Sequence, residues 1–83
     1  MEGRMFVGKL ALHTNESQLQ TYFLKYGKIN DCFILRYPDT KKSKQFGFIN
    51  FVDAESLQKA LNDGPHIIQE HTLEENVFHL YLF

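Results

Sequence analysis

The sequence predicts an α+β domain in which a four-stranded antiparallel sheet carries two helices on one of its faces. Two observations support this prediction. Apolar runs of strand length alternate with amphipathic segments of helix length, in the order strand, helix, strand, strand, helix, strand. The chain has 83 residues, of which 43% are hydrophobic, and this is enough for one packed core. The opposite face of such a sheet is left uncovered by helices.

The first half of the chain contains a strand, a helix and a second strand. Residues 5–10 (MFVGKL) are a short apolar run typical of a strand. The stretch that follows predicts a helix, with Thr14 or Asn15 as the N-cap and Gly27 directly after the last turn. Residues 29–37 (INDCFILRY) are rich in β-forming residues and lead into a turn and a basic loop, PDTKKSK. The apolar residues of the helix recur at helical spacing, at Leu19, Tyr22, Phe23 and Tyr26.

The second half repeats the pattern. Residues 45–52 (QFGFINFV) predict a third strand, and the next segment predicts a helix that begins at an Asp53 N-cap and ends before Gly64. The remaining residues return to extended character and supply the fourth strand, with Leu73 directed inward. The expected apolar face of the second helix consists of Ala54, Leu57, Ala60 and Leu61.

This order of elements corresponds to a ferredoxin-like β-α-β-β-α-β sandwich. We expect a single domain over residues 1–83, with a core of about 4–77 and an apolar C-terminal extension, 78–83. The extension has three interpretations that the sequence leaves open. It prolongs the fourth strand, folds across the open face, or contacts another segment or subunit.

The composition favours a soluble protein of a reducing, intracellular compartment. The single cysteine, Cys32, cannot form a disulfide within the chain. No apolar run approaches the roughly 18 residues of a membrane span, and the start MEGRMFVG lacks the apolar region of a signal peptide. We therefore expect no association with a membrane.

Charge is distributed unevenly, although the net charge is only −1. Residues 1–44 carry eight lysines and arginines against four acids, whereas residues 45–83 carry one lysine against six acids. Such asymmetry is typical of a protein with one surface for a polyanion and another that repels it. Ordinary solvated charge is the alternative interpretation.

Side-chain alternation predicts which residues face the uncovered side of the sheet. Successive side chains of a strand point to opposite faces. Ile49 and Phe51 are natural core residues, so Phe46 and Phe48 are expected to point outward together with Asn50. In the first two strands, the same reasoning assigns Met5, Val7, Cys32 and Ile34 to the core. The predicted open face holds Phe6, Phe33, Phe46 and Phe48, with Leu35 beside them and Arg4 and Lys44 near its edge.

A cluster of exposed rings indicates single-stranded nucleic acid as the ligand. Exposed rings are unfavourable in water, but every base has an apolar π-face that can stack on them. The phosphates require nearby cations, and neither predicted helix is basic enough to enter the major groove of a duplex. A stretch of nine residues, from the end of the second strand to the start of the third, contains four cationic side chains: Arg36, Lys41, Lys42 and Lys44.

These residues resemble the RNA recognition motif, and the resemblance covers essentially the whole chain. KQFGFINF is similar to the octamer signature of that family, Lys/Arg-Gly-Phe/Tyr-Gly/Ala-Phe-Val-x-Phe/Tyr, except that Gln45 stands where glycine is usual. MFVGKL is similar to the hexamer motif and lies about forty residues upstream, as a β-α-β unit requires. The run from DCFILR through PDTKKSKQFGF is similar to the heterogeneous nuclear ribonucleoprotein A/B and Musashi type. A second departure is Glu70, where the family often has a glycine before its last strand.

The resemblance implies sequence-selective binding of single-stranded RNA, in the processing or regulation of pre-mRNA or mRNA, in the nucleus, the cytoplasm or both. It implies that Phe6 and Phe48 stack on two adjacent bases, that Phe46 inserts against sugar rings, and that Lys44 neutralises a phosphate. It also implies additional base contacts from the second strand and from the start of the first. The candidate RNA-binding residues are Arg4, Phe6, Phe33, Leu35, Lys41, Lys42, Lys44, Phe46, Phe48 and Asn50.

No catalytic or metal site is predicted. The spacing of the four histidines gives no helical i, i+4 pair and no zinc motif with the cysteine, so surface or turn positions are expected for them. No serine, cysteine or carboxylate constellation indicates catalysis, and we expect a binding module without enzyme activity or cofactor. The fold also hosts small hydrolases such as acylphosphatases, but fold does not determine function. The histidines are His13, His66, His71 and His79.

Other partners remain open at this point. A protein–protein interaction module that uses the sheet, the helices or the apolar tail is the alternative from another functional class. Single-stranded DNA would use the same platform, and only contacts to the 2′-hydroxyl would exclude it. An adjacent domain of the same kind is plausible because one module that binds a few nucleotides is usually weak.

Overall fold

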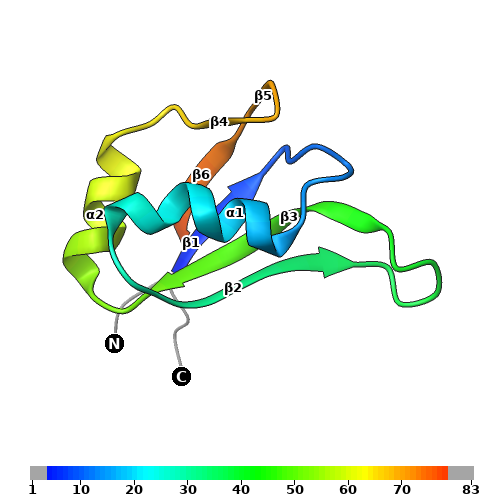
Figure 1. The fold of residues 1–83 in the computed structure, drawn as a ribbon, viewed down its shortest axis with the longest axis horizontal. Helices are drawn as coiled ribbons and strands as arrows, with labels where there is room; N and C mark the ends of the chain where they lie inside the picture. Colours follow the sequence, from blue (N-terminus) through cyan, green and yellow to red (C-terminus); the bar gives the residue numbers. More distant parts are fainter. Residues whose placement is uncertain (1–3, 79–83) are drawn as a thin grey trace.

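The computed structural model describes the backbone of residues 4–78 and the side chains of residues 4–75. Four strands form one antiparallel sheet in the order β2-β3-β1-β6, and both helices cover the same face of it (Figure 1). The predicted α+β architecture is confirmed. The elements are β1 (Arg4–Gly8), α1 (Glu16–Phe23), the 3-10 turn η1 (Leu24–Tyr26), β2 (Ile29–Arg36), β3 (Ser43–Phe51), α2 (Ala54–Asn62), β4 (Ile67–Ile68), β5 (His71–Thr72) and β6 (Glu74–Phe78).

The core lies between the helices and the two central strands, β1 and β3. Met5 pairs with Ile49 across these strands, and both side chains are fully buried against the helices. Phe51 is buried as well, so the predicted inward face of β3 is confirmed. Because strand side chains alternate, burial of this set turns the intervening side chains of β1 and β3 to the opposite face. The helices contribute Leu19, Phe23, Leu57 and Ala60 to the same core.

Both helices begin at side-chain caps. Asn15, one of the two predicted candidates, accepts a hydrogen bond on its side chain from the backbone N–H of Gln18 (2.9 Å), and its own backbone N–H donates the reciprocal bond to Gln18 Oε1 (3.0 Å). Asp53 caps α2 by accepting a bond from the N–H of Ser56 (2.8 Å). The prediction that Ala54 lies on the buried face of α2 is wrong, since Ala54 is exposed. Ser56 is buried instead, so the buried stripe is rotated toward Ser56 and away from the first helical residue.

The segment before the last strand forms a separate β4–β5 hairpin, which the sequence indicated only as extended chain. Ile68 pairs with His71, and the two residues between them, Gln69 and Glu70, have positive φ angles of 51° and 67°. Two-residue hairpin turns of this kind favour glycine and asparagine. Glu70 thus has a left-handed backbone conformation, and this explains why the RNA recognition motif family often has a glycine at this position.

The expectation that the histidines occupy surface or turn positions is wrong for His66. This side chain is 1% exposed, and its ring lies edge-on to the ring of Phe23 with centroids 4.9 Å apart. Its Nε2 lies 2.7 Å from the carbonyl oxygen of Ala60, and its Nδ1 lies 2.9 Å from the hydroxyl of Tyr22. Both ring nitrogens are thus paired, which allows a polar ring to sit in the core. His13 and His71 are exposed, and His79 lies outside the described residues.

Candidate nucleic-acid interface

Four aromatic rings form a continuous row on the face of the sheet opposite the helices. Phe33 on β2 lies 5.6 Å from Phe48 on β3, between ring centroids. Phe48 lies 5.8 Å from Phe6 on β1, and Phe6 lies 5.8 Å from Phe46 on β3. The register explains the row, because Phe48 is the cross-strand partner of both Phe6 and Phe33. Phe33 is 36% exposed and the other three rings are half-buried, so each ring keeps part of its surface open to solvent.

We call this row of four rings, Phe33, Phe48, Phe6 and Phe46, the ring platform. Other predicted residues of β1, β2 and β3 flank it. The guanidinium carbon of Arg4 lies 5.8 Å from the centroid of Phe33, within the range of a cation–π interaction. Asn50 is the partner of Asp31 on β2 and is half-buried beside the platform. Leu35 is half-buried toward the hairpin end of β2. The strands therefore bring all of these residues together with the rings.

A bulge in β3 lies where the octamer departs from the family pattern. The pairing shifts between Ile34, opposite Gly47, and Arg36, opposite Ser43. Gln45 lies inside this bulge with a φ of 68°, a left-handed conformation that favours glycine. The side chain of Gln45 offsets part of the cost of this backbone conformation, because its Nε2 donates a hydrogen bond to the backbone oxygen of Leu10, in the segment after β1.

Gly47 is required by the close approach of β2. A Cβ at this position would lie 2.2 Å from the carbonyl oxygen of Phe33 and 3.0 Å from the Cα of Ile34. Both atoms belong to the backbone and cannot move without separating the strands. The glycine at this position of the octamer thus keeps β2 paired to β3 and holds Phe33 beside Phe48.

The basic residues around the β2–β3 turn do not all face the same way. Lys41 and Lys42 are exposed in the turn, and the Nζ of Lys44 lies 5.3 Å from the ring centroid of Tyr37, which is 50% exposed. Arg36, expected to serve phosphates, instead bonds to Glu16 of α1 through its Nη2 (2.9 Å). The cause is alternation along β2, because Arg36 lies two residues after the buried Ile34 and so points to the same face as Ile34, toward α1.

The Glu16 carboxylate is tied to β2 at two points. Its Oε2 accepts the backbone N–H of Ile34 (3.1 Å), and its Oε1 accepts the bond from Arg36. Partial burial raises the pKa of Glu16, but the hydrogen bonds from Arg36 and Ile34 and the charge of Arg36 outweigh it, so the pKa is lowered below its usual value. Burial, together with the charge of Glu16, raises the pKa of the Cys32 thiol to about 11, so this free cysteine is not activated for chemistry.

Beyond the last ring of the platform, the open face is hollowed. A cavity of about 510 Å³ lies where β1 ends, with Phe6 and Phe46 at its base. Lys9, Gln45 and Glu74 line it as well, and none of them was among the predicted site residues. One signal for Glu74 was available in the sequence, because alternation from the inward Leu73 turns the next side chain outward. Tyr37 was also absent from the prediction, although alternation from Phe33 and Leu35 along the predicted strand turns it to the same face.

Two further observations concern the part of the chain that the structure describes. No group of three or more histidine, cysteine, aspartate or glutamate side chains there is arranged to hold a metal ion. None of the helices within it has the length and apolar character needed to cross a membrane. The apolar extension predicted at 78–83 lies outside the described residues, apart from the backbone of Phe78 at the end of β6.

Comparison with known proteins identifies the relatives of this chain. It is 39% identical over 75 residues to the RNA-binding protein Musashi homolog 1 of Caenorhabditis elegans, and 33% identical over 72 residues to heterogeneous nuclear ribonucleoprotein 27C of Drosophila melanogaster. These matches cover 90% and 87% of this chain but only 23% and 17% of the relatives. The chain thus spans less than a quarter of the length of either relative.

Solved structures agree with this grouping. The RNA-binding domain of Hrp1, determined in complex with RNA, superimposes with a TM-score of 0.86 at 30% identity, over 95% of this chain and 47% of that one. The RNA-binding protein PG1 superimposes with a TM-score of 0.88 at 20% identity, over 98% of this chain and 99% of that one, a likeness that concerns the fold alone. A model of the RNA recognition motif family matches residues 5–74, and this chain therefore belongs to the RNA recognition motif family.

Proposed function

We propose that this domain binds single-stranded RNA sequence-selectively, with bases stacked on the ring platform and phosphates contacted by the lysines beside it. The observation that carries the proposal is the uninterrupted row from Phe33 to Phe46, with every adjacent pair of ring centroids less than 6 Å apart. Bases stack on such a row whatever their identity, and hydrogen bonds to base edges then provide selectivity. The complex of the Hrp1 relative with RNA supports the choice of ligand.

Within this proposal, Phe6 and Phe48 stack on adjacent bases, Phe46 contacts sugar rings, and Arg4, Phe33, Leu35 and Asn50 contribute further base contacts. Lys41, Lys42 and Lys44 neutralise phosphates. The role is binding rather than catalysis. We also infer action on messenger RNA or its precursor, in the nucleus or the cytoplasm, and the name of one relative, a heterogeneous nuclear ribonucleoprotein, supports the nucleus.

Titration of short single-stranded RNA into the wild type and two variants tests the proposal. Phe48→Ala and Phe6→Ala should each weaken binding by about 1–3 kcal/mol. Leu24→Ala, which removes an exposed side chain from the helix side, is the matched control and should bind as the wild type does. Thermal unfolding of each variant separates lost contacts from lost structure. Equal affinity for wild type and both phenylalanine variants would exclude the platform as the binding surface.

Titration with DNA of the same sequence distinguishes the two nucleic acids. If the protein contacts 2′-hydroxyl groups, RNA binds more tightly than the matched DNA. Equal affinities would instead assign the platform to single strands of either kind.

A protein contact on the helix side is the second candidate function. A groove of about 500 Å³ lies between α1 and the β4–β5 hairpin, lined by Tyr22, Thr21 and Ile67, and Ile67 is 55% exposed. Sedimentation over a range of protein concentrations, with and without residues 78–83, tests whether the chain associates and whether the apolar end is responsible.

A further inference from the structure

The cavity beyond the ring platform has the size and the walls of a nucleotide site. Its volume of about 510 Å³ lies within the range of about 300–1,000 Å³ that is typical of small-ligand sites. Phe6 and Phe46 give its lining an apolar part, and two basic residues, Lys9 and Lys44, line it as well. Because the same two rings belong to the platform, a single-stranded RNA that lies on the platform can continue into the cavity.

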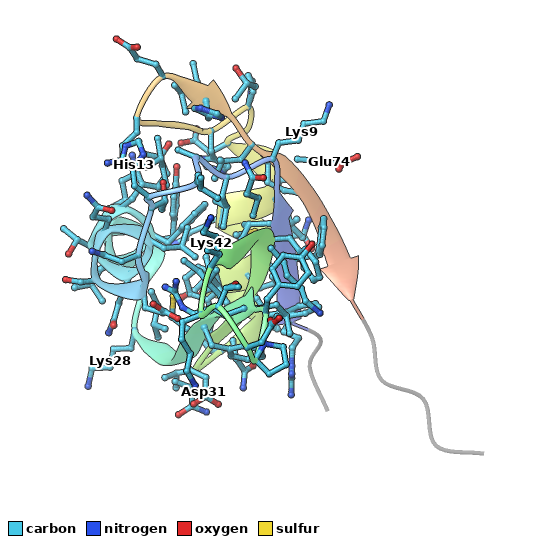
Figure 2. All side chains as sticks on the ribbon, turned by 90° about the vertical axis from the view of Figure 1, so that its right-hand side faces the viewer. Lys9, His13, Lys28, Asp31, Lys42 and Glu74 are labelled. Atoms are coloured by element: carbon cyan, nitrogen blue, oxygen red, sulfur yellow. The ribbon has the colours of Figure 1, made fainter. Side chains whose placement is uncertain are left out.

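The carboxylate of Glu74 lies at the edge of this cavity, close to Gly8. Glu74 begins β6 and is the cross-strand partner of Gly8 on β1. A Cβ at Gly8 would lie 2.9 Å from the ring of Phe6 and 3.4 Å from Oε1 of Glu74, so the absence of a side chain at Gly8 leaves the space between ring and carboxylate open. Figure 2 shows Glu74 projecting away from the helices, with Lys9 beside it at the same corner of the sheet.

This carboxylate has no intramolecular role in the described part of the chain. Glu74 is exposed, and its carboxylate makes no ion pair or hydrogen bond with residues 4–75. A negative charge beside a surface for phosphates weakens binding of a polyanion unless it accepts hydrogen bonds from the ligand. Its position therefore suggests a role in selectivity rather than in affinity.

The chemistry of the bases selects one ligand for such a group. A carboxylate is an acceptor only, and it binds best to two parallel N–H donors. Guanine presents two adjacent donors on its Watson–Crick edge, N1–H and the 2-amino group. Adenine and cytosine present one donor next to an acceptor, and uracil presents one donor between two acceptors, so each places an acceptor against the carboxylate.

We propose that Glu74 makes this cavity a guanine-selective subsite for the nucleotide at the end of the platform where Phe6 and Phe46 lie. The carboxylate accepts the N1–H and the 2-amino group of guanine, and the ring of Phe6 or Phe46 supports the face of the base. Lys9 and Lys44 are available to the adjoining phosphates. The inference rests on the proposed RNA binding, and it adds the carboxylate of Glu74 to the groups that contact the bound RNA.

The test uses RNA octamers of uridine that carry one guanine, moved along the strand position by position. At the best position the wild type should bind guanine about tenfold more tightly than inosine, which lacks only the 2-amino group. Glu74→Gln keeps the shape of the side chain but loses one acceptor and the charge, and should abolish this difference. Glu55→Gln, on the exposed side of α2, is the matched control and should retain it.

The uridine octamer without guanine separates the proposed role from simple repulsion. Glu74→Gln should bind this octamer at least as well as the wild type does, because a negative charge is removed, while its binding of the guanine octamer falls. If binding of both octamers rises by the same factor, Glu74 acts only as a repelling charge and the subsite is refuted. If the wild type binds none of these RNAs, the proposed function itself fails, and that outcome is distinct from the loss of guanine preference alone.

Discussion

The Nε2 atom of Gln45 donates a hydrogen bond to the carbonyl oxygen of Leu10 over 3.0 Å, and the backbone N–H of Leu10 donates one to the carbonyl oxygen of Gln45, also over 3.0 Å. These two bonds join the bulge of β3 to the segment that follows β1. They fix the border between the ring platform and the cavity, since Phe46 follows Gln45 and the cavity touches both Leu10 and Gln45.

Substitution of Gln45 should separate the contribution of this bond from the cost of its backbone conformation. Gln45→Ala removes the side-chain bond but keeps a Cβ at a φ of 68°, and should lower the free energy of unfolding by about 1 kcal/mol. Gln45→Gly also removes the bond but tolerates the left-handed conformation, so it should be about 1 kcal/mol more stable than the alanine variant. Urea denaturation measures both values. Equal stability of the two variants would show that the left-handed position is not strained.

The pairing of Tyr22 with His66 gives a second prediction. The carbonyl oxygen of Ala60 can only accept, so Nε2 of His66 carries the hydrogen and Nδ1 accepts the hydroxyl of Tyr22. Tyr22→Phe should lower the free energy of unfolding by about 1 kcal/mol, and His66→Ala by about 3 kcal/mol or more, because it leaves a cavity and an unpaired carbonyl. Nitrogen chemical shifts of the imidazole report the tautomer directly. His71→Ala, at an exposed position, should change the free energy of unfolding by less than about 0.5 kcal/mol.

The contact between Glu16 and Arg36 predicts a dependence of stability on pH. The pKa of Glu16 is lowered in the folded state, so the folded protein binds this proton less readily than the unfolded chain does. The carboxylate therefore adds stability at a pH above its unfolded pKa, and this contribution is lost as the pH falls through the folded pKa. Glu16→Gln should be less stable than wild type by about 1 kcal/mol at neutral pH and nearly equal to it in strong acid.

The size of this effect is limited by solvent. The side chains of Glu16 and Arg36 are 38% and 35% exposed, so water and salt screen their attraction. Denaturation curves at several pH values measure the difference between the wild type and the variant. A difference that stays constant from acid to neutral pH would mean that the charge of Glu16 contributes nothing and that only the shape of the side chain matters.

The lysines beside the platform should determine how RNA binding depends on salt. Each phosphate contact on a single strand adds about 0.7 to the slope of log affinity against log salt concentration. Lys42→Ala and Lys44→Ala should each reduce the slope by about that amount and weaken all RNA sequences alike. Lys59→Ala, on α2 and so on the helix side, should leave the slope unchanged. Unchanged slopes in all three variants would exclude the β2–β3 turn as a phosphate-binding region.

Local patterns in the sequence predicted the order of the main elements, the cap at Asp53, a cap at Thr14 or Asn15, and the face on which the rings lie. Each of these depends on residues close together in the chain. Burial of Ile49 and Phe51 follows from their spacing in one strand, and the outward direction of Phe46 and Phe48 follows from that burial. The octamer and hexamer carried the family resemblance for the same reason, since each motif lies within a single strand.

The sequence by itself thus determined the order of the two helices and the four strands of the main sheet, and that aromatic rings would occupy the face of the sheet without helices. The tertiary structure decided that Arg36 turns to Glu16, that His66 is buried between Tyr22 and Ala60, and that Glu74 lies over Gly8 at the end of the platform. Hydrophobic periodicity is a property of neighbouring residues, whereas each of these contacts joins segments far apart in the chain. Their geometry depends on how helices, loops and strands distant in the sequence pack together, and this packing leaves no periodic trace in the sequence.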